Sequence, residues 1–339
     1  MAKQTPVRLG IIGTGIFARD AHLPSLQALG DTFEVVAIHA PSRESMAAFE
    51  ARWGSALTQY DDVDDLLARD DIEAVAVIVP IPVLPEVALR ALAAGKHVIS
   101  EKPVAPDLVT GRAALAEYRT HYPDLIWMVG ENWRYESSFV AAAQLVRDGT
   151  LGQVTLCHWG MHLNFPDGKY YHTMWRRKPT FATGLLLDGG VHHMAALRMI
   201  LGEITSVQAQ ATLLRDDLAP VDTLSAALCF ESGLLGSYAV TYTSSEWWGD
   251  PLHIAGTGGG LRIWPGRYEL TTRDQVCTRT LSRHDGVQRE LAAFAAAIRT
   301  GAPHSNSPEQ ALQDVAVVEA MLQSAQRAER VDVPTDLIC

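Results

Sequence analysis

One stretch near the start of the chain decides its fold: Val7-Arg8-Leu9-Gly10-Ile11-Ile12-Gly13-Thr14-Gly15-Ile16-Phe17-Ala18. A β-rich apolar run leads into Gly13, Gly15 and Ala18, which have the spacing Gly-x-Gly-x-x-Ala, and a helical segment follows. In that setting Gly13 permits a tight turn, Gly15 lets the backbone approach a pyrophosphate, and Ala18 lets helix and strand pack closely. The helix N-terminus supplies amide donors. The stretch predicts a dinucleotide-binding loop, and the competing interpretation is a plain glycine turn.

Strands and helices alternate from this loop to about Glu131. The expected strands are Val7–Ile12, Phe33–Ala40, Ala74–Val79, His97–Ser100 and Ile126–Gly130. The expected helices are Asp20–Leu29, Glu44–Trp53, Asp61–Arg69, Leu84–Ala94 and Leu108–His121. Because this alternation is typical of right-handed βαβ units, it predicts a Rossmann domain with a parallel sheet over residues 1–131.

The pattern changes in residues 132–339. After a helix at Phe139–Asp148 come longer runs rich in β-branched and aromatic residues, separated by glycine-containing turns. The expected strands are Val154–Leu163, Ile204–Leu214, Thr223–Phe230, Leu234–Thr243, Leu252–Gly256, Leu261–Trp264 and Tyr268–Thr272. Two helices, Gly286–Arg299 and Pro308–Ala328, close the chain. This part is predicted to be an α+β domain with an antiparallel sheet.

Composition sets limits on partners. The chain has 339 residues, of which 47% are hydrophobic and 20% charged, and its formal net charge is −11. The length favours two domains, and the apolar content argues against disorder. A phosphate backbone would be repelled by the net charge, so no nucleic-acid partner is expected.

Neither a membrane span nor a disulfide framework is expected. The longest apolar stretch, Ala74 to Pro85, contains three prolines and is too short to cross a bilayer. Only Met1 to Pro6 precede the first strand, so we expect no signal peptide and a cytoplasmic protein. Four scattered cysteines are expected to be free thiols: Cys157, Cys229, Cys277 and Cys339.

The end of the second strand bears on the choice of dinucleotide. An acid there would accept from the ribose 2′-hydroxyl of NAD, but Val36-Ala37-Ile38-His39-Ala40-Pro41-Ser42-Arg43 contains none. Ser42 and Arg43 could instead bind a 2′-phosphate. In the alternative interpretation Arg43 merely begins the next helix. The sequence therefore favours NADP, with NAD as the alternative.

Two further motifs resemble those of the Gfo/Idh/MocA family, which includes glucose–fructose oxidoreductase and inositol dehydrogenase. They are Gly95-Lys96-His97-Val98-Ile99-Ser100-Glu101-Lys102-Pro103 and Gly184-Leu185-Leu186-Leu187-Asp188-Gly189-Gly190-Val191-His192. The last two helices also match, so the resemblance covers nearly the whole chain. It implies a Rossmann domain followed by a mixed domain with a large open sheet.

Three residues of these motifs are candidates for catalysis. Asp188 and His192 are four residues apart and would share one helical face. A helix N-terminus disfavours the imidazolium, so we expect His192 to stay neutral and able to take a proton, as alcohol oxidation requires. Lys102 follows a strand at the carboxyl edge of the sheet, where its ammonium could stabilise an alkoxide. The resemblance implies that Lys102, Asp188 and His192 form one catalytic group and that the Lys102–Pro103 bond is cis. The alternatives are an N-cap for Asp188 and a structural His192.

The loops at the carboxyl edge supply the expected dinucleotide contacts. They are Gly13, Gly15, Ile16, Phe17, Ser42, Arg43, Pro80, Glu101 and Lys102. The stretch Val79–Pro85 lacks the Thr, Asn and His that the family often has there, and Ala195 replaces a frequent Asp. These departures leave polyol recognition open and resemble a fungal and bacterial subgroup that uses NADP.

Substrate contacts are expected from polar and aromatic residues near the motifs. They are Arg134, Trp175, Arg176 and His193. Indole faces stack on sugar rings and guanidinium groups donate to hydroxyls or carboxylates. The alternative interpretation is packing at a domain interface. His158, His162 and His172 lack an acid or Cys spaced to complete a metal site, and no metal is expected.

These observations favour an oxidoreductase that transfers hydride between NADP(H) and a hydroxyl or carbonyl of a sugar or other small carbonyl compound. The alternative is a non-catalytic regulator that senses a dinucleotide with the same fold. A sheet covered by helices on one side leaves a face to cover, so we also expect a homodimer or homotetramer. The alternating character of Val207-Gln208-Ala209-Gln210-Ala211 weakens the case for a wholly apolar face.

Overall fold

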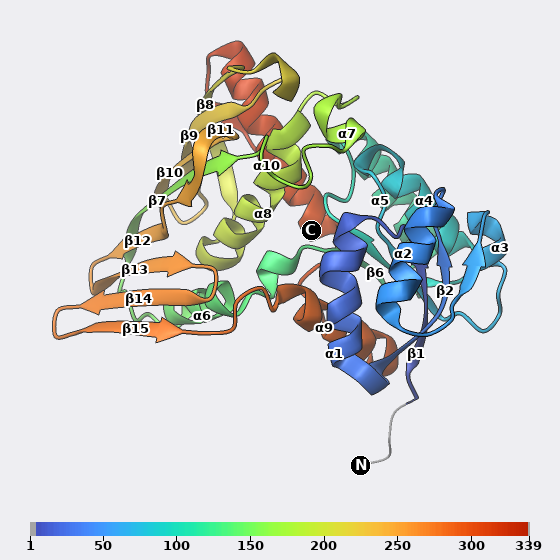
Figure 1. Ribbon diagram of the computed structural model, residues 1–339. Coiled ribbons are helices and arrows are strands. Elements are labelled where there is room, and N and C mark those ends of the chain that lie inside the picture. Colours follow the sequence, from blue (N-terminus) through green and yellow to red (C-terminus); the bar gives the residue numbers. More distant parts are fainter. Residues whose placement is uncertain (1–4, 338–339) are drawn as a thin grey trace. The chain divides into compact units, whose positions relative to one another are not determined.

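The computed structural model describes residues 5–337, which form two compact units (Figure 1). Residues up to Asn132 pack with Val287–Leu312 in the N-terminal unit. Trp133–Gly286 and the residues from Gln313 onward form the C-terminal unit. A segment near the end of the chain, Val287–Leu312, thus completes the unit that the glycine loop begins.

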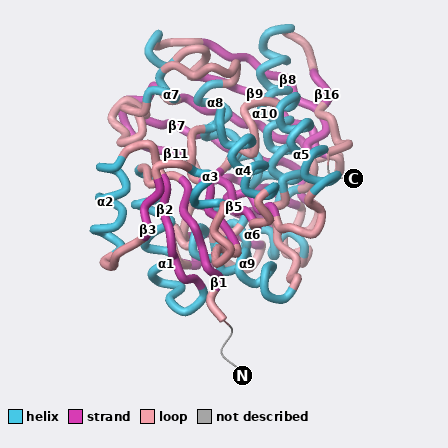
Figure 2. Tube along the Cα trace, turned by 90° about the vertical axis from the view of Figure 1, so that its right-hand side faces the viewer, coloured by secondary structure: helices cyan, strands magenta, loops and turns pink. Residues whose placement is uncertain are grey.

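The N-terminal unit is built on a parallel sheet, which confirms the predicted Rossmann fold. Its strands within the described residues are β1 (Val7–Ile12), β2 (Phe33–His39), β3 (Thr58–Tyr60), β4 (Ala74–Val77), β5 (His97–Glu101) and β6 (Trp127–Gly130). Their order is β3-β2-β1-β4-β5-β6, and Figure 2 shows β1, β2 and β3 running side by side. The order reverses between β1 and β4, which is where ligands of such sheets bind. The edge strand β3 was not expected.

Helices of this unit follow the strands as the sequence predicted. They are α1 (Leu23–Leu29), α2 (Arg43–Trp53), α3 (Val63–Leu67), α4 (Leu84–Ala93) and α5 (Leu108–His121). The residues of β1 and β4 that face these helices, among them Leu9, Ile11 and Val75, have no exposed surface. Continuous apolar strands of this kind fit a sheet covered on both faces.

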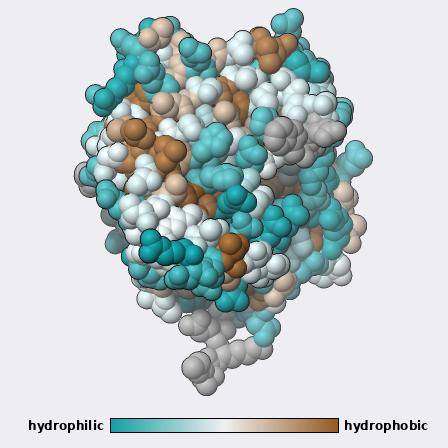
Figure 3. Space-filling model, turned by 90° about the vertical axis from the view of Figure 1, so that its left-hand side faces the viewer, coloured by the Kyte–Doolittle hydropathy of each residue, from teal (hydrophilic) through white to brown (hydrophobic). Residues whose placement is uncertain are grey.

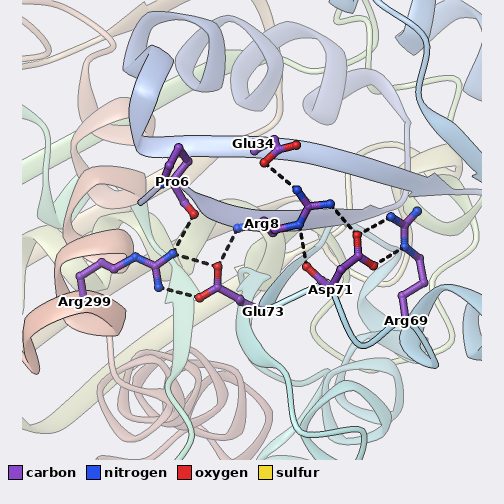
Figure 4. Close-up of polar contacts among 7 residues, drawn as sticks. All are labelled: Pro6, Arg8, Glu34, Arg69, Asp71, Glu73 and Arg299. Atoms are coloured by element: carbon purple, nitrogen blue, oxygen red, sulfur yellow. Dashed lines mark hydrogen bonds and ion pairs between the residues drawn. The ribbon is translucent and has the colours of Figure 1, made fainter. Parts of the chain in front are cut away.

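Within the N-terminal unit, a charged network joins α9 (Gly286–Thr300) to the segments around β1 and β4 (Figure 4). Arg299 Nη1 lies 2.6 Å from Glu73 Oε2, and Arg299 Nη2 donates to the Pro6 carbonyl at 2.8 Å. Glu73 Oε1 also accepts from the backbone amide of Arg8 at 3.2 Å. The guanidinium of Arg8 pairs with Asp71 at 2.5 Å. These contacts tie α9 to β1 and to the turn before β4.

The C-terminal unit contains a large, mainly antiparallel sheet, also as expected. Its strands within the described residues are β7 (Val154–Asn164), β8 (Ile204–Thr212), β9 (Thr223–Phe230), β10 (Leu235–Thr241), β11 (Thr243–Gly249), β12 (Leu252–Gly256), β13 (Gly259–Trp264), β14 (Arg267–Thr272), β15 (Val276–Thr280) and β16 (Val331–Asp332). Their order is β15-β14-β13-β12-β7-β10-β9-β8-β16, and β11 pairs with β7. The pairing of β10 with β7 is parallel. Strands β11, β15 and β16 were not expected.

Helices cover one face of this sheet. They are α6 (Ser137–Arg147), α8 (Gly184–Leu201) and α10 (Pro308–Arg327), whereas α7 (Met174–Arg177) lies against the helical turn at Asp216–Leu218. Along β7, Cys157 and Trp159 are buried, whereas Leu156 and His158 on the opposite face are exposed. Figure 3, viewed from the side of β12 to β15 in Figure 1, shows apolar patches among polar ones.

The structure bears on the expectations about cysteines and about membrane-spanning helices. Cys157, Cys229 and Cys277 are free thiols, whereas Cys339 lies outside the described residues. In the part of the chain that the structure describes, every helix is too short or too polar to cross a membrane.

Candidate active site

The glycine loop has the conformation that a dinucleotide pyrophosphate requires. Gly13 has a φ of +101°, and a Cβ atom there would lie 2.1 Å from the Ile78 carbonyl oxygen. Its amide donates to the His39 carbonyl at 2.7 Å, which draws the loop against the end of β2. A Cβ atom at Gly15 would meet no atom within 4 Å, so the space beside this residue is open. The loop therefore fits the close approach of a phosphate group.

The helix after the loop begins earlier than the sequence predicted and contains a π-helical turn. Ile16 and Phe17 are already helical, Ala18–His22 form the π turn, and α1 follows. Ala18 is fully buried, as close helix–strand packing demands. The ring of Phe17 meets the ring of His22 edge-on, with 5.5 Å between centroids. π turns of this kind are frequent at functional sites.

The end of β2 presents no carboxylate. His39 Nδ1 lies 3.0 Å from the Tyr60 carbonyl oxygen. The Ser42 hydroxyl caps α2 by accepting from the Ser45 amide at 3.1 Å. Arg43 begins α2 with a side chain that is 78% exposed and pairs with Asp61. Arg43 thus begins the helix, as the alternative interpretation held, and its guanidinium also remains open to solvent.

Lys102 stands directly after the carboxyl end of β5, which pairs with β4, one of the two strands between which the strand order reverses. The Lys102–Pro103 peptide is cis, which confirms the implication of the resemblance. The Glu101 carboxylate does not face solvent: its Oε1 lies 2.6 Å from Nε2 of the buried His22. Pro80 is exposed in the loop after β4.

The helix that carries Asp188 and His192 corrects one part of the sequence argument. The N-cap of α8 is Thr183, so Asp188 is the fifth helical residue and His192 the ninth. Asp188 is therefore not an N-cap, and His192 lies well past the first turn of the helix, to which the effect of a helix N-terminus is confined. The two residues still share one helical face.

Asp188 is held by a side chain that the sequence assigned to substrate. Its Oδ2 accepts from Arg176 Nε at 2.7 Å, and this pair is mostly buried. The Arg176 guanidinium lies over the rings of Trp175 and Tyr170, at 3.9 and 4.9 Å from their centroids. The structure thus brings Trp175, Arg176 and Asp188 together across a separation of 12 residues.

A buried tyrosine packs against the same turn of α8. A Cβ atom at Gly189 would lie 2.2 Å from the Tyr242 hydroxyl, so only glycine leaves room for this ring. Burial, and then the charge of Asp188, raise the pKa of Tyr242 far above its usual value. Both effects favour the neutral phenol of Tyr242. Sequence reasoning missed it because nothing in Thr241-Tyr242-Thr243 links it to the glycine motif 53 residues earlier.

Trp133 stacks on His192, with 5.3 Å between centroids and 17° between ring planes. The same indole stacks on Phe139 at 5.1 Å. The orientation of the His192 ring is thus set by packing within the C-terminal unit. Two expected substrate contacts lie in the interior instead. His193 is 3% exposed and its Nδ1 lies 2.6 Å from the Tyr238 hydroxyl, and Arg134 makes a buried pair with Asp314 at 2.8 Å.

The expected site residues therefore fall into three sets. The glycine loop, Glu101 and Lys102 lie at the carboxyl edge of the N-terminal sheet, and Asp188, His192 and Arg176 lie around the first turns of α8. Arg134 and His193 are occupied inside the C-terminal unit by contacts of their own. Within residues 5–337 no three His, Cys, Asp or Glu side chains are grouped to hold a metal ion.

Comparison with known proteins matches both parts of the chain to one family. Residues 7–122 match the oxidoreductase family model with an NAD-binding Rossmann fold, and residues 143–333 match the C-terminal alpha/beta domain of the same family. Dehydrogenase FPY6 of Fusarium mangiferae is 31% identical over 94% of this chain and 96% of its own length. The D-xylose 1-dehydrogenase (NADP(+)) 2 of Haloferax volcanii is 27% identical over 96% and 99%.

A solved oxidoreductase from Thermotoga maritima superposes with a TM-score of 0.90 at 33% identity, covering 98% of this chain and 99% of that one. Both parts of the chain thus match one family, and the relatives align with nearly the whole length of the chain. The chain belongs to the Gfo/Idh/MocA family of NAD(P)-binding oxidoreductases.

Proposed function

We propose that the protein transfers hydride between NADP(H) and a hydroxyl or carbonyl carbon of a small sugar-like molecule, with Lys102, Asp188 and His192 as its catalytic group. The observation that carries the proposal is the arrangement on α8. There Asp188 is held by Arg176, and His192, one turn later, is held by Trp133. Fixed side chains of this kind suit a group that must meet a reacting atom in one geometry.

Each residue has a distinct task. The dinucleotide, when bound, gives or accepts the hydride. His192 gives a proton to the substrate oxygen when a carbonyl is reduced, and takes it back when an alcohol is oxidised. Lys102 donates a hydrogen bond to that oxygen as negative charge develops on it. Asp188 orients the substrate hydroxyl by accepting from it, while Arg176 keeps the carboxylate in place.

The preference for NADP rests on the end of β2. A carboxylate at this position would repel a 2′-phosphate, and the strand ends in His39 instead. Arg43 is exposed, and its pair with Asp61 is a surface ion pair of the kind that contributes little stability. The guanidinium can therefore exchange Asp61 for a phosphate at small cost.

We expect NADPH to bind at least about tenfold more tightly than NADH, because a charged hydrogen bond contributes roughly 1.5–3 kcal/mol. Arg43→Ala should remove this difference and leave the NADH affinity unchanged. Arg52→Ala is the matched control, since Arg52 also lies on α2 and forms an exposed pair with an aspartate. Quenching of nicotinamide fluorescence measures both affinities. Equal affinities in the wild type would contradict the preference for NADP.

The substrate class should be tested with the dinucleotide that binds more tightly. The relatives include a D-xylose dehydrogenase, and the Trp175–Arg176 pair beside Asp188 offers a ring face and donors for a hydroxylated molecule. Aldoses, sugar lactones, keto sugars and small dicarbonyl compounds should be screened by absorbance at the nicotinamide band. Turnover of a hydroxylated ring compound supports the proposal. Tight NADPH binding without turnover of any compound would favour a dinucleotide-sensing regulator.

We also propose that the protein assembles through the uncovered face of its C-terminal sheet. Leu156 and Leu235 are paired across β7 and β10 and are 52% and 57% exposed on that face. Adjacent exposed leucines favour burial against a second copy. Light scattering should show a dimer or tetramer at micromolar concentration, and Leu156→Glu should shift it toward monomer. Leu214→Glu, at a 65% exposed position beyond the end of β8, should not. A strictly monomeric wild type would contradict this assembly.

A further inference from the structure

One buried hydrogen bond joins the segment after the glycine loop to the end of β5. His22 Nε2 lies 2.6 Å from Glu101 Oε1, and these side chains are 2% and 10% exposed. His22 is the last residue of the π turn that follows the loop, and Glu101 is the last residue of β5, directly before Lys102. Two segments separated by 79 residues thus meet through one polar contact at the carboxyl edge of the sheet.

The packing around this pair leaves little freedom to either side chain. Phe17, an expected dinucleotide contact, meets the His22 ring edge-on. On the other side, Glu101 is paired in register with Gly130 of β6. A Cβ atom at Gly130 would lie 3.3 Å from Glu101 Oε1 and 3.6 Å from Glu290 Oε1. The missing side chain at Gly130 makes the space in which the two carboxyl groups lie.

Glu101 has two acidic neighbours, Glu290 and Glu131, and its carboxyl group makes its hydrogen bond to His22. Glu290 of α9 is fully buried, and Asn306 Nδ2 lies 3.4 Å from its Oε2. Burial, and then the charges of Glu101 and Glu131, raise the pKa of Glu290 well above its usual value. Each of the two carboxyl groups has its own polar contact, Asn306 Nδ2 for Glu290 and His22 Nε2 for Glu101. Loss of His22 Nε2 would leave the buried Glu101 carboxyl group without its hydrogen-bond partner.

We infer that His22 is a positioning residue for Lys102, acting through Glu101. The peptide between Glu101 and Lys102 determines where the Lys102 side chain leaves the backbone. The hydrogen bond from the Glu101 side chain to His22 restrains this peptide from one side. The segment that carries the glycine loop and the proposed catalytic lysine are thereby held in one geometry by a shared contact. The inference rests on the proposed function, in which Lys102 acts on the substrate oxygen.

The test compares His22→Leu with His22→Gln, which keeps an N–H donor at similar reach. His22→Leu should lower kcat by about tenfold or more, with KM and the NADPH affinity within about threefold of wild type. His22→Gln should recover most of kcat. His97→Leu is the matched control, because His97 lies at the other end of β5 and also makes a hydrogen bond, as an acceptor from the Ile126 amide at 3.0 Å. It should lower thermal stability without the loss of kcat.

A second readout does not depend on activity. The chain has five lysines, so reductive methylation with ¹³C-formaldehyde gives few resonances, and Lys102→Arg assigns that of Lys102. This resonance should move in His22→Leu and stay in place in His97→Leu. If His22→Leu does not fold, His22→Leu/Glu101→Leu replaces the whole pair with apolar groups, which interiors tolerate better than a lone charge. The double variant should bind NADPH, turn over slowly and show the displaced resonance.

Two outcomes overturn the inference. One is a folded His22→Leu protein, or double variant, with the kcat and the Lys102 resonance of the wild type. The other is an equal loss of kcat in His97→Leu, which would show a general effect of stability. Failure of the proposed function gives a different result. Lys102→Ala would then turn over like wild type, whether or not the Lys102 resonance moves in His22→Leu.

Discussion

His192→Asn should lower kcat by about 10²-fold or more, the usual scale for the loss of a general acid or base. Asparagine keeps a polar side chain of similar reach but cannot exchange a proton near neutral pH. Because Trp133 and α8 hold this position from within the C-terminal unit, the variant should fold and bind NADPH like wild type. Single-turnover rates and melting temperatures, measured on the same preparations, separate chemistry from stability.

The adjacent histidine supplies the control. His193 points into the core, where its Nδ1 contacts the Tyr238 hydroxyl and its ring meets Trp133 and Trp159 edge-on. His193→Asn should therefore lower the melting temperature and affect the single-turnover rate much less. The reverse pattern would exchange the roles given to the two histidines.

Lys102 completes this experiment. Lys102→Ala should also reduce turnover while dinucleotide binding changes less. Lys102→Arg should not fully restore it, because a guanidinium differs from an ammonium in shape and in proton chemistry. Asp188→Asn should impair turnover through the loss of charge beside Arg176. If Lys102→Ala and His192→Asn both fold, bind NADPH and turn over like wild type, the catalytic group is wrong and a regulator becomes the better interpretation.

Much of the fold could be predicted because local patterns agreed with the final packing. The bounds of β1, α5, β9 and β12 are those expected, since each is a recognisable apolar or alternating run bounded by turn or capping residues. The elements that were missed lack such a pattern. Strand β3 has one half-buried residue and two exposed ones, and β15 is nearly all exposed. Pairing with a neighbour, not side-chain burial, makes these segments strands.

The site was harder to predict, because contacts over long separations decide it. The N-terminus of α8 was expected close to Asp188 and His192, but the helix begins at Gly184 and continues through the adjacent Gly189 and Gly190, which are unfavourable in a helix. No local signal paired Arg176 with Asp188, His22 with Glu101, or Tyr242 with Gly189. His193 was expected at the substrate because it follows His192, yet adjacent helical residues face different directions. Residue types pointed to the chemistry, and packing decided which side chains could take part.

The two glycines of the nucleotide loop should respond differently to the same added methyl group. Gly13→Ala should destabilise the protein by about 2 kcal/mol or more, since alanine at a positive φ costs roughly 1–2 kcal/mol before any clash. Its Cβ atom would also meet the Ile78 backbone at 2.1 Å, and backbone at the end of β4 cannot move aside easily. Binding of NADPH should be lost with the loop. Thermal unfolding and fluorescence titration measure the two effects.

Gly15→Ala adds its methyl group to open space, where no atom lies within 4 Å of the new Cβ. It should therefore keep the melting temperature of the wild type and still weaken NADPH binding by about tenfold or more, because the space it fills is where the pyrophosphate must approach the backbone. Only an intact loop with its ligand space blocked gives normal stability together with weak binding. A Gly15→Ala protein that binds NADPH like wild type would show that the pyrophosphate lies elsewhere, whereas a large loss of stability would mean that Gly15 serves the turn and not the ligand.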